Sequence, residues 1–145
     1  MKIYDYKDQI INRYRNYNPI FHEEKSATEL KNSKGKSLYI YLEDEIIIEY
    51  DNWDIHYSCE DIDDVYAAMD KVDNILNNKE AILKFYVNNS FFASSSISYK
   101  DNYTKEDILD IFNSFNMNSI LEEKEVKVII NFWDDANNYE IDLNK

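Results

Sequence analysis

The stretch Ser37–Asp70, SLYIYLEDEIIIEYDNWDIHYSCEDIDDVYAAMD, decides the fold of this chain. It holds eleven carboxylates and no Lys or Arg. Its first half alternates apolar and polar residues with the period of two that β-strands require. Its second half has the apolar spacing of an amphipathic helix. We therefore expect an acidic unit made of strands followed by one helix.

Three antiparallel strands are predicted over residues 38–42, 45–50 and 53–57, with turns near Glu43-Asp44 and Asp51-Asn52. Each strand alternates apolar residues, which would face the core, with polar ones. This alternation fixes the register, because a slip of one residue would exchange the buried and exposed sets of side chains.

The outward face of these strands would carry aromatic and acidic side chains. Apolar residues at positions 38, 40 and 42 turn Tyr39 and Tyr41 outward, near Glu49 on the neighbouring strand. Asp54 and His56 share the outward face of the third strand. The sequence thus predicts a polar sheet surface with two exposed tyrosines.

A helix is predicted to begin at Ser58 and to end at Asn77-Asn78. Ser58-x-x-Asp61 resembles a capping box, and the acids that follow would interact favourably with the helix dipole. The apolar stripe expected to face the core consists of Ile62, Val65, Tyr66, Met69, Val72 and Leu76.

The flanking segments complete the predicted order of elements. Residues 3–16 have helical spacing, residues 20–23 are a candidate short strand in an ambiguous region, and residues 31–36 are a loop. Further elements are a hairpin over 81–87 and 91–98 around Asn88-Asn89, a helix capped by Thr104, and strands at 126–133 and 139–143. Strand runs separated by helices indicate an α+β fold: a single domain over residues 1–145, with an antiparallel sheet of five to seven strands and about three helices.

Size and composition agree with an ordinary globular protein. The chain has 145 residues, of which 44% are hydrophobic and 31% charged, and its single Gly argues against a Gly-rich phosphate loop. The single Cys59 cannot form an internal disulfide, and no apolar run has the length of a signal peptide or a membrane span. We expect a cytoplasmic protein.

The negative charge is unevenly distributed. The net charge of −13 divides into +3 for residues 1–36, −11 for residues 37–70 and −5 for residues 71–145. Such a surface repels nucleic acid and anionic membranes, and it attracts basic proteins or cations. The alternative explanation is that the acidity serves solubility alone.

No catalytic or cofactor motif stands out. The acids at positions 60–64 lack the oxygen ladder and turn glycine of an EF-hand, so a charged first helical turn is the favoured interpretation. His22 lacks the second helical His of a zinc protease, and no plausible Cys-His dyad for Cys59 is set by spacing. His56 is interpreted as an exposed strand residue, with metal ligand or proton carrier as the alternatives. We expect no catalytic residue, no metal and no cofactor.

The segment Ile46–Tyr57, IIIEYDNWDIHY, is followed by a capped acidic helix and then by a hairpin that carries Leu83, Phe85, Val87 and Phe91. Over about residues 38–98 this pattern resembles small bacterial proteins grouped with the immunity proteins of polymorphic toxin systems. In that pattern a His often follows the Trp, where this chain has Asp54. The resemblance implies a small cytoplasmic α+β domain that binds and blocks a toxin domain without chemistry of its own.

The leading hypothesis is therefore an immunity-type protein, an antitoxin whose acidic face covers a basic toxin surface, such as a nuclease active site. The residues predicted to bind the partner are Tyr39, Tyr41, Glu43, Asp44, Glu49, Asp51, Asp54, Asp61 and Asp64. One alternative is a small-molecule or metal-binding domain or an enzyme that uses His56 with Asp54 and Glu49. Another is a regulatory protein without a toxin partner.

Overall fold

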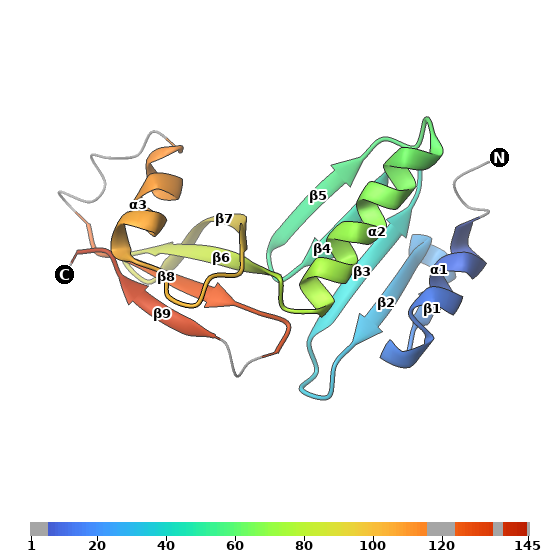
Figure 1. The fold of residues 1–145 in the computed structure, drawn as a ribbon, viewed down its shortest axis with the longest axis horizontal. Coiled ribbons are helices and arrows are strands. Elements are labelled where there is room, and N and C mark those ends of the chain that lie inside the picture. The colour runs from blue at the N-terminus through green and yellow to red at the C-terminus, as the bar shows by residue number, and fades with distance from the viewer. Residues whose placement is uncertain (1–5, 116–123, 135–137, 145) are drawn as a thin grey trace. The chain divides into compact units, whose positions relative to one another are not determined.

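The described strands of this chain form two antiparallel sheets, the first accompanied by two α-helices and the second by one (Figure 1). The structure is a computed structural model and describes residues 6–115, 124–134 and 138–144. The first sheet has the strand order β1-β2-β3-β4-β5, and the second has the order β7-β6-β8-β9. The chain divides into two compact units, residues 1–76 and 77–145, with one sheet in each.

This arrangement confirms the predicted α+β class, its antiparallel pairing and its three α-helices. The strands expected in one sheet of five to seven are distributed over sheets of five and four strands. The single domain over residues 1–145 stays a prediction.

Unit 1 contains two α-helices, two short 3-10 helices and five strands. They are α1 (Lys7–Arg13), η2 (Arg15–Tyr17), β1 (Ile20–His22), η3 (Glu23–Lys25), β2 (Ala27–Lys31), β3 (Ser37–Leu42), β4 (Ile46–Tyr50), β5 (Trp53–Tyr57) and α2 (Ile62–Leu76). The three strands predicted between residues 38 and 57 are confirmed to within one residue. The helix predicted over residues 3–16 is divided into α1 and η2, and residues 3–5 lie outside the described residues.

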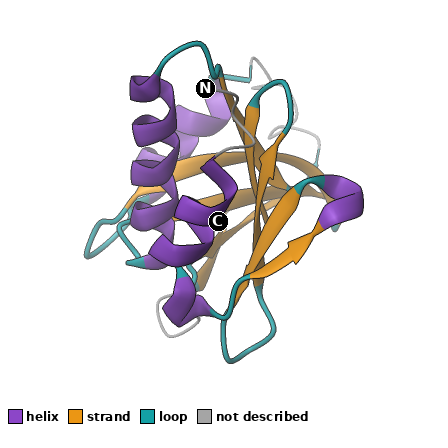
Figure 2. Cartoon of the chain, turned by 90° about the vertical axis from the view of Figure 1, so that its right-hand side faces the viewer, coloured by secondary structure: helices purple, strands orange, loops and turns teal. Residues whose placement is uncertain are grey.

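Alternation sets the register of the first sheet as the sequence predicted. Opposite residues are Leu38 and Tyr50 on β3 and β4, and Ile48 and Ile55 on β4 and β5. The core face holds Leu38, Ile40, Ile46 and Ile48, all completely buried, and α1 and α2 lie on this face (Figure 2). Each such aliphatic side chain contributes about 1.5–3 kcal/mol to folding when it leaves water.

Strand β2 lies where the sequence reading was ambiguous. Its first four residues, from Ala27 to Leu30, are all buried, so the strand lacks the exposed positions that reveal alternation. Among them, Thr28 is 1% exposed, and its hydroxyl has no hydrogen-bond partner among the described atoms. Such a hydroxyl loses its hydration on folding without compensation.

Helix α2 begins at Ile62, later than predicted, because Asp61 rather than Ser58 caps it. The Asp61 carboxylate accepts hydrogen bonds from the backbone N–H groups of Asp63 and Asp64, at 2.9 and 3.2 Å. The Ser58 hydroxyl instead accepts from the N–H of Glu60 at 3.2 Å, in a turn before the helix. The prediction of Ser58 as the cap is therefore wrong.

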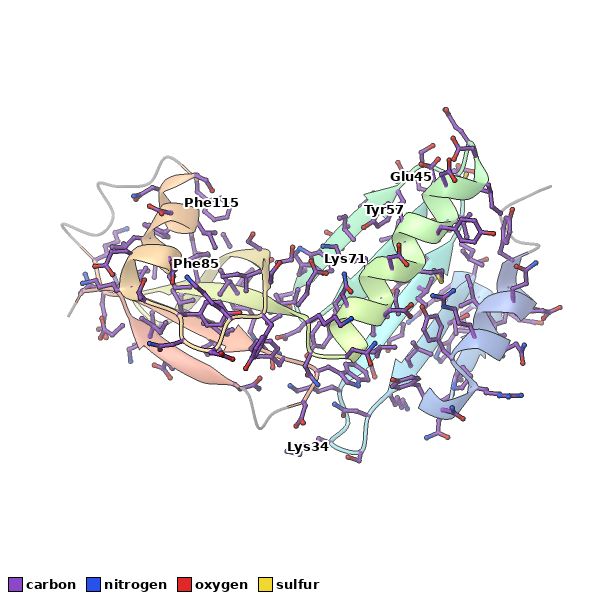
Figure 3. All side chains as sticks on the ribbon, in the orientation of Figure 1. Lys34, Glu45, Tyr57, Lys71, Phe85 and Phe115 are labelled. Atoms are coloured by element: carbon purple, nitrogen blue, oxygen red, sulfur yellow. The ribbon has the colours of Figure 1, made fainter. Side chains whose placement is uncertain are left out.

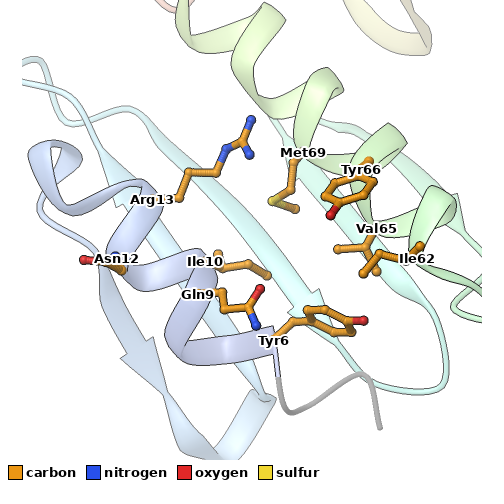
Figure 4. Close-up of a pocket in the computed structure, with 9 residues that line it drawn as sticks. All are labelled: Tyr6, Gln9, Ile10, Asn12, Arg13, Ile62, Val65, Tyr66 and Met69. Carbon is orange, nitrogen blue, oxygen red and sulfur yellow. The ribbon is translucent and has the colours of Figure 1, made fainter. Parts of the chain in front are cut away.

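The predicted apolar stripe of α2 is correct in its centre and wrong at two positions. Val65, Met69, Val72 and Leu76 are buried, together with Ala68 and Ile75, which the prediction omitted. Ile62 and Tyr66 are 43% and 57% exposed. Both line a groove of about 260 Å³ between α1 and α2 (Figure 4), so they face solvent beside the core rather than within it.

Polar contacts join α1 to α2 beside this groove. The Tyr14 hydroxyl donates to Asp73 Oδ1 at 2.8 Å, and the Arg13 guanidinium donates to Asp73 Oδ2 at 2.5 Å. Burial, assisted by Asp73, raises the pKa of Tyr14 far above its usual value, so its hydroxyl remains a donor. The carboxylate therefore fixes the position of α1 against α2.

Unit 2 contains β6 (Glu80–Val87), β7 (Ser90–Ser98), α3 (Lys105–Asn113), β8 (Val126–Asn131) and β9 (Tyr139–Asp142). The predicted hairpin is confirmed, and the predicted strand over 126–133 ends at Asn131. The core lies between the sheet and α3, where the Phe85 ring lies 5.3 Å from that of Phe112 and 5.8 Å from that of Phe115 (Figure 3).

A capping box begins α3, as the sequence predicted. The Thr104 hydroxyl accepts from the N–H of Asp107 at 3.2 Å, and Asp107 accepts from the N–H of Thr104 at 2.9 Å. The backbone bond from Thr104, followed by the Lys100 ammonium, lowers the pKa of Asp107 to about 2. The cap is therefore strongest when Asp107 is ionised.

Asparagine occupies most turn positions that need a positive φ. Asn88 and Asn89 join β6 to β7 with φ of 50° and 68°, and Asn52 has φ of 64° between β4 and β5. Asn18 and Asn78 are further examples, whereas the single glycine supplies one such position, Gly35. Asparagine tolerates this conformation better than most residues with a side chain.

Candidate functional site

The outward face of the first sheet gathers polar side chains in rows across its strands. Glu29, Tyr39, Glu49 and Asp54 lie directly opposite one another on β2, β3, β4 and β5. A second row contains Tyr41, Ile47 and His56 on β3, β4 and β5. The structure thus brings together four of the nine predicted partner-binding residues, namely Tyr39, Tyr41, Glu49 and Asp54.

Glu29 is a buried carboxylate at the β2 end of this face. Its side chain is 7% exposed, and it accepts hydrogen bonds from Ser37 at 2.6 Å and from a ring nitrogen of His22 at 2.8 Å. Burial alone would raise the pKa of Glu29, but these hydrogen bonds outweigh burial, so its pKa is lowered. Glu29 therefore carries a negative charge beside Tyr39, its register partner on β3.

Tyr39 and Tyr41 form a stacked pair beside this carboxylate. Their ring centroids are 6.0 Å apart, and the ammonium of Lys25 lies 5.9 Å above the Tyr39 ring. The Tyr41 hydroxyl lies 3.5 Å from Glu49. Burial first, and then the carboxylates of Glu29 and Glu49, raise the pKa of these tyrosines, so both stay neutral at physiological pH.

His56 lies between two carboxylates at the β5 end of the face. Its Nδ1 is 2.6 Å from Glu45 and its Nε2 is 3.3 Å from Asp54, and all three side chains are about half exposed or more. These hydrogen bonds, that of Glu45 first, raise the pKa of His56 above its usual value. The ring neutralises part of the acidic face when it is protonated.

Among the described residues, neither histidine forms a Ser-His-acid triad or part of a three-ligand metal site. At His56, one ring nitrogen faces Glu45 and the other faces Asp54. At Glu29, the carboxylate lies between His22 and Ser37. A Ser-His-acid triad needs the imidazole between serine and acid. Within residues 6–115, 124–134 and 138–144, no group of three His, Cys, Asp or Glu side chains is arranged to hold a metal ion.

An open polar hollow lies at the β4–β5 turn. It measures about 450 Å³ and is lined by Ser37, Tyr39, Glu49, Tyr50, Asp51, Asn52, Trp53 and Asp54. Three of its lining residues carry carboxylates: Glu49 and Asp54, which are exposed, and Asp51, which is half-buried. A hollow of this kind accepts a cationic side chain from a partner more readily than an apolar ligand.

Of the other predicted site residues, Asp51 lines this hollow with Tyr39, Glu49 and Asp54, and the remaining four lie in the β3–β4 turn and at the start of α2. Glu43 and Asp44 are in the β3–β4 turn, at the end of the unit where Figure 3 labels Glu45. The Cys59 thiol donates to the Asp44 carbonyl at 2.9 Å, which ties this turn to the segment before α2. Asp51 is half-buried in the β4–β5 turn, at the opposite end of β4.

Asp61 and Asp64 belong to the cap of α2. Asp61 accepts two backbone hydrogen bonds, and the Asp64 carboxylate lies 3.4 Å from the N–H of Asp61. Both residues thus have a structural explanation that does not require a partner. The nine predicted residues therefore do not form one continuous patch.

The sequence reasoning did not place Glu29, Ser37 and Glu45 on this surface. Ser37 and Glu29 meet because β2 pairs with β3, and that pairing depends on a strand hidden in an ambiguous region. The sequence of β2 carries no alternation that would have revealed the strand, because its first four residues are all buried.

In the part of the chain that the structure describes, no helix is long and apolar enough to cross a membrane. Comparison with protein-family models, with curated proteins and with solved structures gave no match to this chain.

Proposed function

We propose that this protein is an immunity-type inhibitor that binds a basic toxin domain through the outward face of its first sheet. The observation that carries the proposal is the row formed by Tyr39, Glu49 and Asp54, with Tyr41 and His56 in the adjacent row. Aromatic rings and exposed carboxylates there share one surface, which is the composition expected of a site for cationic side chains.

Electrostatics would act first in such an encounter. Residues 37–70 carry eleven acids and no Lys or Arg, so a basic partner would be attracted before contact. Charge complementarity raises association rates by orders of magnitude at low salt. Arginine or lysine side chains of the toxin would then meet Glu49 and Asp54, and its access to substrate would be blocked by occlusion.

The tyrosines would slow dissociation. Tyr39 and Tyr41 are half-buried and stacked, so little side-chain freedom remains to be lost on binding. Arginine stacks well on such rings. Tyr39 and Tyr41 are therefore the proposed anchors, whereas Asp61 and Asp64 contribute to the general negative field.

The test is the association rate with a cognate basic toxin domain, sought first among the products of the neighbouring genes. Reversing two charges, Glu49→Lys with Asp54→Lys, is expected to slow association at least tenfold at low salt and to weaken its salt dependence. Stopped-flow fluorescence at several salt concentrations measures both effects.

A matched control separates the local face from net charge. Asp70→Lys with Asp110→Lys makes the same change in net charge at exposed helix positions of α2 and α3. The control variant should associate with the toxin domain at close to the wild-type rate. Equal slowing in both variants would show that only the overall charge matters, and unchanged association in the face variant would exclude this surface.

A further inference from the structure

His56 makes two contacts that only its protonated ring can satisfy together. Its Nδ1 lies 2.6 Å from Glu45 Oε2, and its Nε2 lies 3.3 Å from Asp54 Oδ2. A neutral imidazole has one N–H and one bare nitrogen, whereas the imidazolium donates from both nitrogens. An ionised carboxylate accepts hydrogen bonds and donates none. The arrangement at His56 is therefore that of an imidazolium between two carboxylates.

Loss of the proton removes one of these two contacts. The bare nitrogen of the neutral ring would face a carboxylate oxygen with no hydrogen atom between them, so that hydrogen bond could no longer form. The contact to Glu45 is the shorter of the two, and we expect the remaining proton to stay on Nδ1. The contact to Asp54 is then the one that is lost.

Asp54 connects His56 to the proposed binding face. It lies directly opposite Glu49 across β4 and β5, in the row that continues to Tyr39. The side chains of Asp54 and His56 are 57% and 49% exposed, so a partner can reach both of them. Glu45 precedes β4 and lies outside this row. Of the two carboxylates that the imidazolium contacts, Asp54 is therefore the one that belongs to the row.

The other neighbours of His56 on this face are further carboxylates and neutral side chains. Its register partner on β4 is Ile47, and beyond Ile47 on β3 lies Tyr41, whose hydroxyl stays neutral because burial, and then Glu49, raise its pKa. The β3–β4 turn adds the carboxylates of residues 43 and 44. Among the described strands, β5 is the last of its sheet, so no strand pairs with its outer edge. Histidine is the side chain whose charge ordinarily changes between pH 5 and 8, and on this part of the face that side chain is His56.

We propose that His56 is a proton-operated switch of the binding face: its imidazolium holds Asp54, and loss of the proton releases Asp54 to pair, together with Glu49, with a cationic side chain of the partner. The proposal rests on the proposed function in taking the outward sheet face as the binding surface. Protonation also adds a positive charge to a face that must attract cations. Both effects have the same sign, so binding strengthens as pH rises. Because Glu45 and then Asp54 raise the pKa of His56, the change falls above pH 6.5.

The position of the remaining proton tests the release of Asp54 directly. Nitrogen-15 NMR of the full chain distinguishes a ring nitrogen that carries hydrogen from one that does not. We expect both ring nitrogens of His56 to carry hydrogen at pH 5.5, and Nδ1 alone to carry it at pH 8.5. A neutral ring with its proton on Nε2 would retain the contact to Asp54 and would overturn the proposal.

A short arginine peptide with blocked ends, acetyl-tetraarginine amide, probes the face without a toxin domain. It has no group that titrates between pH 5.5 and 8.5. At low salt we expect it to bind the wild type about three- to tenfold more tightly at pH 8.5 than at pH 5.5. Isothermal titration calorimetry measures the affinity, and the backbone amide signals of Tyr39, Glu49 and Asp54 locate the site. Equal affinity at the two pH values, or no binding at this face, overturns the proposal.

Two histidine variants assign the pH dependence to one residue. The chain contains two histidines, and His22 lies on β1 at the opposite edge of the sheet from β5, so His22→Gln is the matched control for His56→Gln. His56→Gln should bind the peptide with nearly equal affinity at the two pH values, and His22→Gln should keep the wild-type ratio. A ratio that survives in His56→Gln, or disappears in His22→Gln, contradicts the assignment.

These measurements distinguish failure of the switch from failure of the proposed function. If the peptide shows the expected pH ratio but Glu49→Lys with Asp54→Lys leaves toxin association unchanged, the switch stands and the toxin interaction through this face is wrong. If charge reversal slows toxin association but the peptide binds equally well at both pH values, the face binds its partner and the switch is wrong.

Discussion

The two units of this chain bury one apolar face of a sheet in the same way, but they expose different surfaces to solvent. Each has an antiparallel sheet with an apolar face covered by helix, α1 and α2 in unit 1 and α3 in unit 2. In each unit an aspartate helps to cap a helix: Asp61 caps α2, and Asp107 completes the capping box of Thr104 in α3. Unit 1 places carboxylates across the outward face of its sheet. Unit 2 keeps its longest edge strand free of charge. The packing of apolar side chains therefore fixes the core of each unit, whereas the charge on its outward surface differs between the units.

The largest expected effect comes from substitutions in the two cores. Val65→Asp places a charge in the buried side of α2, and Phe112→Ala empties a completely buried position of α3. We expect each to lower the free energy of unfolding, by about 3 kcal/mol or more for the former and about 3–5 kcal/mol for the latter. Urea denaturation measures both, with Asp70→Lys as an exposed control that should change little.

The same variants decide whether the units form one domain. Trp53 lies in unit 1 and Trp133 in unit 2, so single-tryptophan versions report on each unit separately. A single domain requires that Val65→Asp shift the unfolding midpoint seen at both tryptophans. A shift at Trp53 alone would show that unit 2 unfolds independently.

Changes of intermediate size in the free energy of unfolding are expected when a buried hydroxyl is removed from one core or introduced into the other. Thr28 buries an unsatisfied hydroxyl in unit 1, and Val128 of unit 2 is completely buried and apolar. Thr28→Val should raise the free energy of unfolding by about 1 kcal/mol, and the reverse change Val128→Thr should lower it by about 1–3 kcal/mol. Thermal and urea unfolding test the pair. Loss of stability in Thr28→Val would show that the hydroxyl has a partner in solution.

The smallest effects are expected from pH, with opposite directions in the two units. The pKa of His56 is raised from 6.5, so its contribution is fully present below pH 6.5 and is lost as pH rises through the higher folded value. The pKa of Asp107 is lowered from 3.8 to about 2, so its contribution is present above pH 3.8 and is lost as pH falls through about 2.

Melting temperatures of His56→Gln and Asp107→Asn, compared with the wild type across pH, test these directions. The first variant should differ from the wild type at pH 5 to 6 and converge with it in alkaline solution. The second should differ at neutral pH and converge near pH 2. Differences that do not depend on pH would indicate steric rather than electrostatic effects.

Local patterns predicted most of the fold, and long-range pairing explains what they missed. The alternation in residues 38–57 placed Tyr39, Glu49 and Asp54 on one face, because register within hairpins is set locally. Strand β2 was not predicted, because both of its faces are buried and it shows no alternation. Glu29 was missed with it, since a buried carboxylate is recognised only from its partners His22 and Ser37.

The cap of α2 illustrates a second limit. Ser58 and Asp61 both suit a helix N-terminus, and the choice depends on where the chain leaves β5. The Cys59 thiol bonds to the β3–β4 turn and holds residues 58–60 in a non-helical path. Only tertiary structure supplies that contact, so the sequence placed the start of the helix too early.

The use of asparagine in the turns has a consequence for the unfolded chain. Glycine loses more backbone freedom on folding than any other residue, and this chain contains a single glycine. Asn52, Asn88 and Asn89 adopt positive φ at some cost in the native state, yet each has fewer conformations to lose than glycine would have. The denatured ensemble is therefore narrower than that of a glycine-rich chain of equal length. The unfolded chain therefore loses less conformational entropy when these hairpins fold, and this contributes to their stability.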